Sequence, residues 1–325
     1  MNEINIEECL NKIEKIALLE NNWNNNGANK FSDKVINNVK KFLSYSLYNP
    51  FVAPTANNSI QLEYEKDNGK YLEIEIYENK IETFEIDAEK KETEQVFSIN
   101  DFFKVLNLVK IFYNGTPQNA VLFTGAFNPP TIAHYHMVHS VLRNDKMNFD
   151  YVIFALSTEK FLKNKQDKTN DWYFSESERT EMVLSMIAHN PNALLYGIEV
   201  GYTYDVLCGV KQEFNCENLY FACGSDKLYE IERWGHAKKL LKEFNFYILL
   251  RGTESYEYTE NKCNKIFANT KYFLAKDNEK YKYVSATQVR DKIKQNLDYT
   301  NLLEPHVYKY LNENKEILNR RVYAN

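Results

Sequence analysis

The sequence predicts an α/β protein whose carboxy-terminal part is built on a parallel sheet, preceded by a small α+β domain. Apolar and polar residues alternate within residues 60–86, whereas short continuous apolar runs prevail from residue 120 onward. Those runs recur at the interval of strand-helix-strand units. The stretch 113–119, rich in polar and turn-forming residues, separates the two patterns. We therefore expect domains at residues 1–114 and 119–325.

The amino-terminal domain is expected to combine helices with an antiparallel sheet. Apolar residues at helical spacing predict a helix within 4–20, and Ser32 is a candidate N-cap for a second helix. Alternation of apolar and polar residues predicts an antiparallel meander of strands near 60–64, 72–76 and 81–86. A further helical pattern begins at Asn100. No cluster of catalytic residue types is visible in this domain.

The carboxy-terminal domain opens with a strand, a glycine-containing loop and a helix. Apolar runs predict strands at 120–123, 151–156, 219–222 and 246–250. Helical patterns lie between them at 175–189, 203–213 and 235–243. Strands that read as continuous apolar runs are typical of a parallel sheet with helices on both faces.

Composition limits the classes of function. The 325 residues are 44% hydrophobic and 14% aromatic, which supplies enough apolar surface for a folded core. The net charge is −5 and no long basic block occurs, so binding to nucleic acid is not indicated. The five cysteines form no CxxC pair, which indicates reduced thiols rather than a disulfide framework. With no signal-peptide core and no run of 18 apolar residues, we expect a cytoplasmic protein without membrane partners.

The loop after the first strand of the carboxy-terminal domain carries residues suited to phosphate. It reads Thr124-Gly125-Ala126-Phe127-Asn128-Pro129-Pro130-Thr131-Ile132-Ala133-His134. In a parallel sheet, ligands bind beyond the carboxyl ends of strands, where a helix amino terminus offers unpaired N–H groups and partial positive charge. Gly125 would let the backbone approach a nucleotide, and the ring of His134 could donate to a phosphate oxygen.

A second candidate helix start lies far downstream, at Val284-Ser285-Ala286-Thr287-Gln288-Val289-Arg290. Ser285 or Thr287 can cap this helix. Arg290, one turn later, presents a guanidinium fork that matches phosphate oxygens. We expect the two helix starts to face one site.

Both segments resemble the motifs of the nucleotidyltransferase superfamily, a Gly-x-Phe-Asn-Pro loop leading to a histidine and a later Ser-Ser-Thr-x-x-Arg segment. Ala133 and Ala286 stand where the family usually carries Gly and Ser. Residues 120–295 further resemble the nicotinamide and nicotinate mononucleotide adenylyltransferases, through blocks at 175–182, 202–207 and 224–226 and through two tryptophans. This resemblance implies a Rossmann-like nucleotidyltransferase domain.

The resemblance also implies roles for individual residues. His134 and Arg290 would be catalytic, acting on the charge of the polyphosphate. The residues expected to bind ATP are Gly125, Ala126, Phe127, Thr131, His134, Gly224, Asp226, Ser285, Thr287 and Arg290. Those expected to bind the mononucleotide are Asn128, Lys163, Trp172, Thr203 and Trp234. Lys160 and Lys165 lie close to Lys163 in the sequence, and spacing does not show which of the three lysines would contact the phosphates.

The implied reaction is an attack by the 5′-phosphate of a pyridine mononucleotide on the α-phosphorus of ATP, giving NAD or deamido-NAD and pyrophosphate. Mg²⁺ would be bound mainly through the ATP phosphates. No metal site of the protein itself is expected, because His136 and His139 have no carboxylate or cysteine at ligand spacing. ATP and the mononucleotide are the expected partners. A homo-oligomer and a protein partner for the amino-terminal domain are left open.

Two other functions are compatible with the sequence. The same fold could adenylylate another phosphorylated acceptor, such as FMN or phosphopantetheine, since the ATP-side motifs are shared across the superfamily. Alternatively, the motifs could serve a non-catalytic nucleotide sensor that acts through the amino-terminal domain.

Overall fold

The computed structural model describes residues 6–163, 172–198, 201–250, 254–275, 281 and 283–322. Contacts between residues divide the chain into two compact units. Unit 1 comprises Met1–Gly115 and Ala188–Pro191, and unit 2 comprises Thr116–Ile187 and Asn192–Asn325. Of the residues singled out in the sequence, Lys165 lies outside the described ranges.

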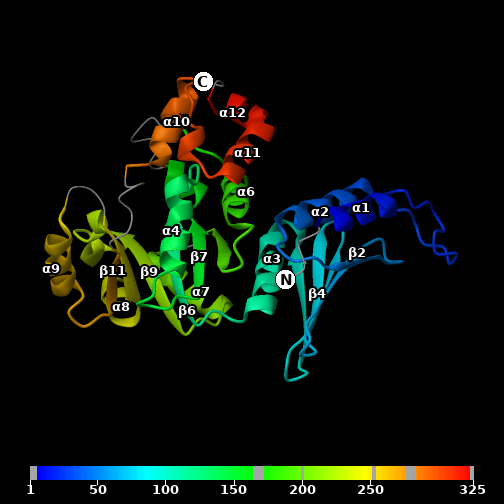
Figure 1. Ribbon diagram of the computed structural model, residues 1–325, viewed down its shortest axis with the longest axis horizontal. Helices are drawn as coiled ribbons and strands as arrows, with labels where there is room; N and C mark the ends of the chain where they lie inside the picture. Colours follow the sequence, from blue (N-terminus) through cyan, green and yellow to red (C-terminus); the bar gives the residue numbers. More distant parts are fainter. Residues whose placement is uncertain are drawn as a thin grey trace. The chain divides into compact units, whose positions relative to one another are not determined.

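Unit 1 is an antiparallel sheet combined with helices. Its elements are α1 (Ile6–Ala17), α2 (Asp33–Tyr45), β1 (Phe51–Pro54), β2 (Ile60–Glu65), β3 (Tyr71–Ile76), β4 (Lys80–Ile86), β5 (Glu92–Ser98), η1 (Ile99–Asp101) and α3 (Phe102–Asn114). The strands pair in chain order, which confirms the predicted meander. Figure 1 shows α1 and α2 along one side of this sheet. Alternate strand residues such as Ile60, Leu62 and Ile74 are buried, as the sequence pattern requires.

Two strands of unit 1 are not predicted by the sequence pattern. Every residue of β5 except Phe97 is exposed, so β5 lacks the apolar alternation that marks a half-buried strand. Its pairing with β4 makes it a strand. β1 is a short edge strand that ends at Pro54, a position where the missing N–H disturbs no central ladder.

Unit 2 alternates strands with helices. Its elements are β6 (Asn119–Gly125), α4 (Ile132–Leu142), β7 (Tyr151–Leu156), α6 (Glu176–Ile187), β8 (Ala193–Ile198), α7 (Thr203–Glu213), β9 (Asn218–Gly224), η2 (Ser225–Lys227), η3 (Ile231–Arg233), α8 (Ala237–Glu243), β10 (Asn245–Leu249), α9 (Tyr256–Ile266), β11 (Tyr272–Ala275), α10 (Ala286–Lys294), η4 (Thr300–Leu302), α11 (Pro305–Glu313) and α12 (Lys315–Val322). All pairings between its strands are parallel, which confirms the predicted sheet. β8 and β11, which were not predicted, form its two edges.

The order of the strands reverses in the middle of this sheet. It runs β11-β10-β9-β6-β7-β8, so the chain proceeds outward from β6 on one side and from β9 on the other. β6 pairs with β9 only as far as Leu122 and Phe221, although the two strands continue to Gly125 and Gly224. The carboxyl ends of β6 and β9 therefore separate at the reversal, which is where open parallel sheets bind ligands.

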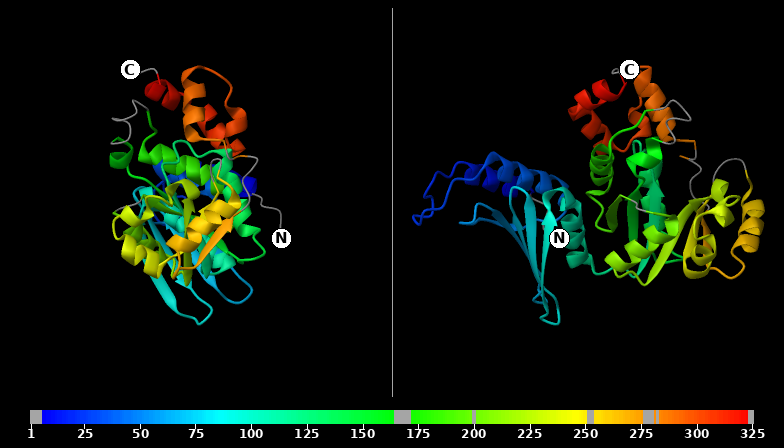
Figure 2. Two further views of the ribbon diagram at one scale, coloured as in Figure 1. Left: turned by 90° about the vertical axis from the view of Figure 1, so that its left-hand side faces the viewer. Right: turned by 180° about the vertical axis from the view of Figure 1, so that it is seen from behind.

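The last three helices complete unit 2. Both views of Figure 2 show α10, α11 and α12, coloured orange to red, gathered at one end of the unit. α11 packs against α6. Its N-cap, the buried carboxylate of Glu304, accepts hydrogen bonds from the N–H groups of His306 and Val307. None of the helices in the described ranges has the length and hydrophobicity to span a bilayer.

Candidate active site

The loop between β6 and α4 is the first part of the site. β6 ends at Gly125, and Thr131 is the N-cap of α4. Phe127, and not the preceding glycine, has a left-handed backbone conformation, with φ of 46°. The peptide bond between Asn128 and Pro129 is cis. A bulky residue holds a left-handed conformation only where its surroundings support it, so the contacts of this loop decide its shape.

Arg290 joins this loop to the start of α10. Its Nη1 donates to the main-chain oxygen of Asn128 at 2.7 Å, and its Nη2 donates to Thr287 Oγ1 at 3.1 Å. The guanidinium is buried. Ser285 caps α10, because its Oγ accepts from the N–H of Gln288 at 3.2 Å. The two helix starts that the sequence expected to face one site are thus brought together, and part of the arginine fork is used in joining them.

His134 lies in the first turn of α4, where Thr131 orients its ring. The N–H of Thr131 donates to His134 Nδ1 at 2.9 Å, and Thr131 Oγ1 lies 2.9 Å from the same nitrogen. A backbone N–H can only donate, so Nδ1 is the acceptor and the hydrogen of the neutral ring is on Nε2. The ring of Phe127 packs against the imidazole at 5.0 Å between centroids. Thr131 itself is fully buried.

Asn128 links the loop to the segment that precedes α6. Its Nδ2 donates to the main-chain oxygen of Trp172 at 3.1 Å, and its Oδ1 accepts from the N–H of Phe174 at 2.8 Å. The side chain is buried. Trp172 is half-buried, with its ring 4.9 Å from that of Phe174. The structure therefore brings Trp172 beside the loop, as the sequence required of a shared site.

The carboxyl end of β9 supplies the other side of the strand reversal. Gly224 is the last residue of β9, and Asp226 follows in the short helix η2 with its side chain exposed. Ser225 between them is buried. Because β9 is the neighbour of β6, the loops that follow these two strands leave the sheet from adjacent positions.

Thr203 and Trp234 share a second neighbourhood. Thr203 is the first residue of α7, and the ring of the preceding Tyr202 lies so close to Gly235 that a Cβ at position 235 would overlap it. Trp234, next to Gly235, is half-buried with its ring 6.0 Å from that of Phe221 on β9.

Lys160 and Lys163 are exposed, and in the described part of the chain neither side chain makes a hydrogen bond or ion pair.

Arg179 is a residue of this region for which the sequence pattern predicts no individual role. It lies in α6 and is fully buried. Its Nη1 donates to the main-chain oxygen of Ala126 at 2.9 Å, and its Nε donates to that of Phe174 at 3.2 Å. Arg179 lies in the block Ser175–Met182. The sequence alone does not show whether an arginine is buried or exposed, so no local signal distinguishes it.

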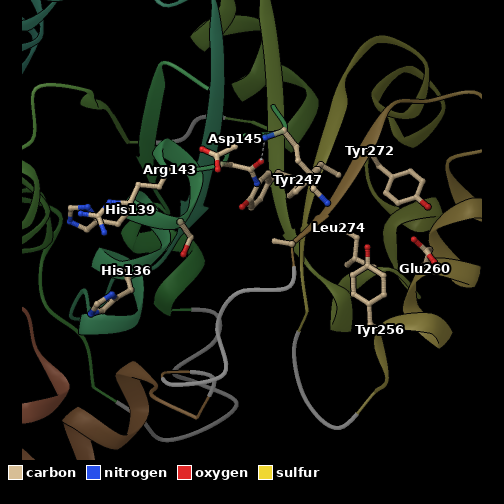
Figure 3. A pocket seen from close by; sticks show the side chains of 14 residues that line it. His136, His139, Arg143, Asp145, Tyr247, Tyr256, Glu260, Tyr272 and Leu274 are labelled. Carbon is tan, nitrogen blue, oxygen red and sulfur yellow. Dashed lines mark hydrogen bonds between the residues drawn. The ribbon is translucent and has the colours of Figure 1, made fainter. Parts of the chain in front are cut away.

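A separate groove of about 870 Å³ lies between α4 and the edge of the sheet formed by β10 and β11. Figure 3 shows His136, His139 and Arg143 on one wall and Tyr256, Glu260 and Tyr272 on the other. Burial and the nearby Arg143 hold the pKa of His139 below its ordinary value. Asp145 and Lys146 also line the groove, so its walls carry charges of both signs and favour neither an anion nor a cation.

A parallel sheet with a strand-order reversal, flanked by two capped helix starts, defines a nucleotide-binding α/β protein. The chain belongs to the cytidylyltransferase-like family, whose model matches residues 122–292. The matched range includes both His134 and Arg290. The resemblance to the nucleotidyltransferase superfamily is thereby confirmed.

Individual relatives match this chain over most of their own length. The chain is 26% identical over 198 residues to a nicotinate-nucleotide adenylyltransferase of Bacillus subtilis, covering 59% of this chain and 95% of the relative. It is 25% identical over 196 residues to a Fusobacterium nucleatum protein named probable nicotinate-nucleotide adenylyltransferase, covering 58% and 95%. A solved structure of Plasmodium falciparum nicotinic acid mononucleotide adenylyltransferase complexed with APC is 20% identical, with a TM-score of 0.47, and covers 62% of this chain and 97% of that one.

Proposed function

We propose that unit 2 transfers the adenylyl group of ATP to a pyridine mononucleotide, forming deamido-NAD or NAD and releasing pyrophosphate. The hydrogen bond between Arg290 and Asn128 carries this proposal, because it brings two phosphate-binding helix starts to the strand reversal. The relatives of this chain are named nicotinate-nucleotide adenylyltransferase or probable nicotinate-nucleotide adenylyltransferase. Nicotinate mononucleotide is therefore the acceptor that we favour over nicotinamide mononucleotide, FMN or phosphopantetheine.

The reaction needs no nucleophile from the protein. An oxygen of the mononucleotide 5′-phosphate forms a bond to the α-phosphorus of ATP, while the bond from that phosphorus to the bridging oxygen of the β-phosphate breaks. The electron pair of the broken bond leaves with pyrophosphate. The protein contributes by holding the two phosphates in line and by stabilising the charge that develops on their oxygens.

His134 is the residue best prepared for that task. Thr131 occupies Nδ1, so Nε2 carries the hydrogen and acts as the donor toward a phosphate oxygen. The amino terminus of α4 adds partial positive charge at the same place. The start of α10, capped by Ser285, adds a second set of N–H groups. The ATP-binding and mononucleotide-binding residues expected from the sequence are retained as part of this proposal.

Mg²⁺ belongs to this proposal as a component of the substrate MgATP. In the described ranges, no group of three or more His, Cys, Asp or Glu side chains is arranged to hold a metal ion. The donors around the loop after β6 are N–H groups, a hydroxyl and an imidazole, which suit phosphate oxygens better than a cation. Oxygens of the ATP phosphates, rather than protein side chains, would therefore coordinate the ion.

We also propose residues 119–325 as the catalytic domain and residues 1–114 as a separate domain, in line with the division of contacts after Gly115. A cytoplasmic location is part of the same proposal. None of the five cysteines forms a disulfide in the described part of the chain, which suits a reducing compartment.

The test is an assay with a panel of acceptors. The purified chain is incubated with MgATP and, separately, with nicotinate mononucleotide, nicotinamide mononucleotide, FMN and phosphopantetheine, and products are separated by chromatography. We expect a dinucleotide and pyrophosphate in equal amounts with a pyridine mononucleotide, most rapidly with the nicotinate form. Product formed with FMN or phosphopantetheine, but with neither pyridine mononucleotide, would assign a different acceptor. ATP binding without any product would favour the nucleotide sensor.

A further inference from the structure

Arg179 is a fully buried cation that the proposed reaction does not use. It projects from the first turns of α6 and is the largest of the fully buried side chains in the described part of the chain. Removing a guanidinium from water is costly unless its N–H groups are well hydrogen-bonded. A surface position or an apolar side chain would avoid that cost. Its burial therefore needs a reason in what the guanidinium contacts.

The guanidinium connects two segments that the sequence assigned to different substrates. Its Nη1 donates to Ala126 in the loop expected to bind ATP, at 2.9 Å. Its Nε donates to Phe174, two residues after Trp172, which was expected to bind the mononucleotide, at 3.2 Å. The side chain of Asn128 joins the same two segments in parallel, through Trp172 and Phe174 at 3.1 and 2.8 Å.

These contacts also fix the direction of a backbone donor at the tip of the loop. In a trans peptide the C=O and the following N–H point in opposite directions, so the N–H of Phe127 points away from Arg179. On the other side of Phe127, Arg290 binds the carbonyl of Asn128. Two buried guanidinium groups thus hold the carbonyls that flank the left-handed Phe127.

We propose that Arg179 is a positioning residue that sets the relative placement of the ATP-binding loop and the segment carrying Trp172. It does so by binding the carbonyls of Ala126 and Phe174 with one rigid group. A lysine cannot replace it, because an ammonium is a point charge without the planar fork that reaches two separate oxygens. The identity of the substrates in this inference rests on the proposed function. The connection between the loop after β6 and the segment carrying Trp172 rests on the hydrogen bonds alone.

Two substitutions and a matched control test the role. Arg179→Met removes both hydrogen bonds and keeps an apolar stem, and Arg179→Lys keeps the charge but not the fork. The control is Met186→Ala, which creates a cavity on the same buried face of α6, about two turns further on. Folded protein is quantified for each variant by thermal unfolding, and kcat and KM are expressed per folded molecule.

The expected result separates positioning from stability. Displacing one reactant by about 1 Å can lower the rate about 100-fold, so Arg179→Met should show that order of loss in kcat/KM, with a raised KM for the mononucleotide. Compared with Arg179→Met, Arg179→Lys should have a melting temperature closer to that of the parent, while its kcat/KM should stay low. Met186→Ala should have a lower melting temperature but the kcat and KM of the parent protein.

Parent-like kcat and KM in folded Arg179→Met would overturn the proposal. If that variant does not fold, Arg179→Lys decides, and parent-like parameters there overturn it. If the parent itself forms no dinucleotide, the proposed reaction fails, and the positioning role is judged on binding of a non-hydrolysable ATP analogue by calorimetry. An unchanged Kd in the Arg179 variants would then overturn it, and a weakened Kd in these variants but not in Met186→Ala would support it.

Discussion

Arg290 Nη1 lies 2.7 Å from the main-chain oxygen of Asn128, although 162 residues separate the two in the chain. Replacing Arg290 by Met should therefore destabilise unit 2, since it leaves a buried carbonyl without its donor. We expect a loss of about 1–3 kcal/mol in the free energy of unfolding, measured in urea. Lys294→Met, an exposed change on the same helix, should stay within about 0.5 kcal/mol of the parent. Equal effects of the two changes would contradict the structural role.

The orientation of His134 predicts which histidine of α4 matters for turnover. His134→Ala removes the Nε2–H donor, and loss of one well-placed donor typically lowers kcat about 100-fold or more. His139→Ala, on the same helix but in the wall of the separate groove, should keep the parent rate. The measurement is initial velocity with MgATP and nicotinate mononucleotide. Comparable losses in both variants would show that the helix, rather than the His134 donor, is being perturbed.

Two serine caps provide a matched pair, one in each unit. Ser32 Oγ accepts from the N–H of Val35 at the start of α2, and Ser285 Oγ accepts from that of Gln288 at the start of α10. Replacing either serine by alanine should cost about 1 kcal/mol of stability. Only Ser285→Ala should also lower turnover, because α10 belongs to the proposed site. Parent-like turnover in Ser285→Ala would show that the start of α10 caps the helix without taking part in the reaction.

Lys110 in α3 predicts a pH dependence of stability. Burial lowers the pKa of this fully buried amine to about 7, from its ordinary value near 10.5. Between these values the unfolded chain holds a proton that the folded chain lacks, so raising the pH from 7 toward 10 should stabilise the parent. Lys110→Met removes this effect and should be more stable than the parent by a few kcal/mol at pH 7.

The measurement for Lys110 is urea unfolding of both proteins at a series of pH values. The difference in unfolding free energy should be largest at pH 7 and below, and should shrink as the pH approaches 10. Other groups titrate alike in both proteins, so the difference isolates Lys110. Parallel stability curves across this range would show that the amine is protonated in the folded chain.

Much of unit 2 was predictable because its strands are buried on both faces. Tyr151–Leu156 is buried at every position and is a continuous apolar run, so burial and sequence pattern coincide. β5 of unit 1 shows the opposite case, since its exposed polar residues become a strand only through pairing with β4. Local pattern carries no information about such pairing.

The residues proposed for the site could be named from the sequence, but the contacts among them could not. The loop after β6 and the start of α10 could be found from residue types suited to phosphate. That Arg290 would bind the carbonyl of Asn128 could not, because a hydrogen bond to a main-chain oxygen leaves no mark on the identity of the acceptor residue. For the same reason the sequence does not reveal the role of Arg179, which depends on its burial and on its hydrogen bonds to the main-chain oxygens of Ala126 and Phe174.

The position of β6 has a consequence for how the protein is made. β6 is the first strand of its sheet to be synthesised, yet it lies between β7 and β9 in the interior. The chain therefore supplies a central strand first, then the strands on one side of it, β7 and β8, and then those on the other side, β9, β10 and β11. The loop that follows β6 leaves the ribosome long before α10 does. Newly made protein should thus acquire nucleotide affinity only late in translation, when α10 emerges.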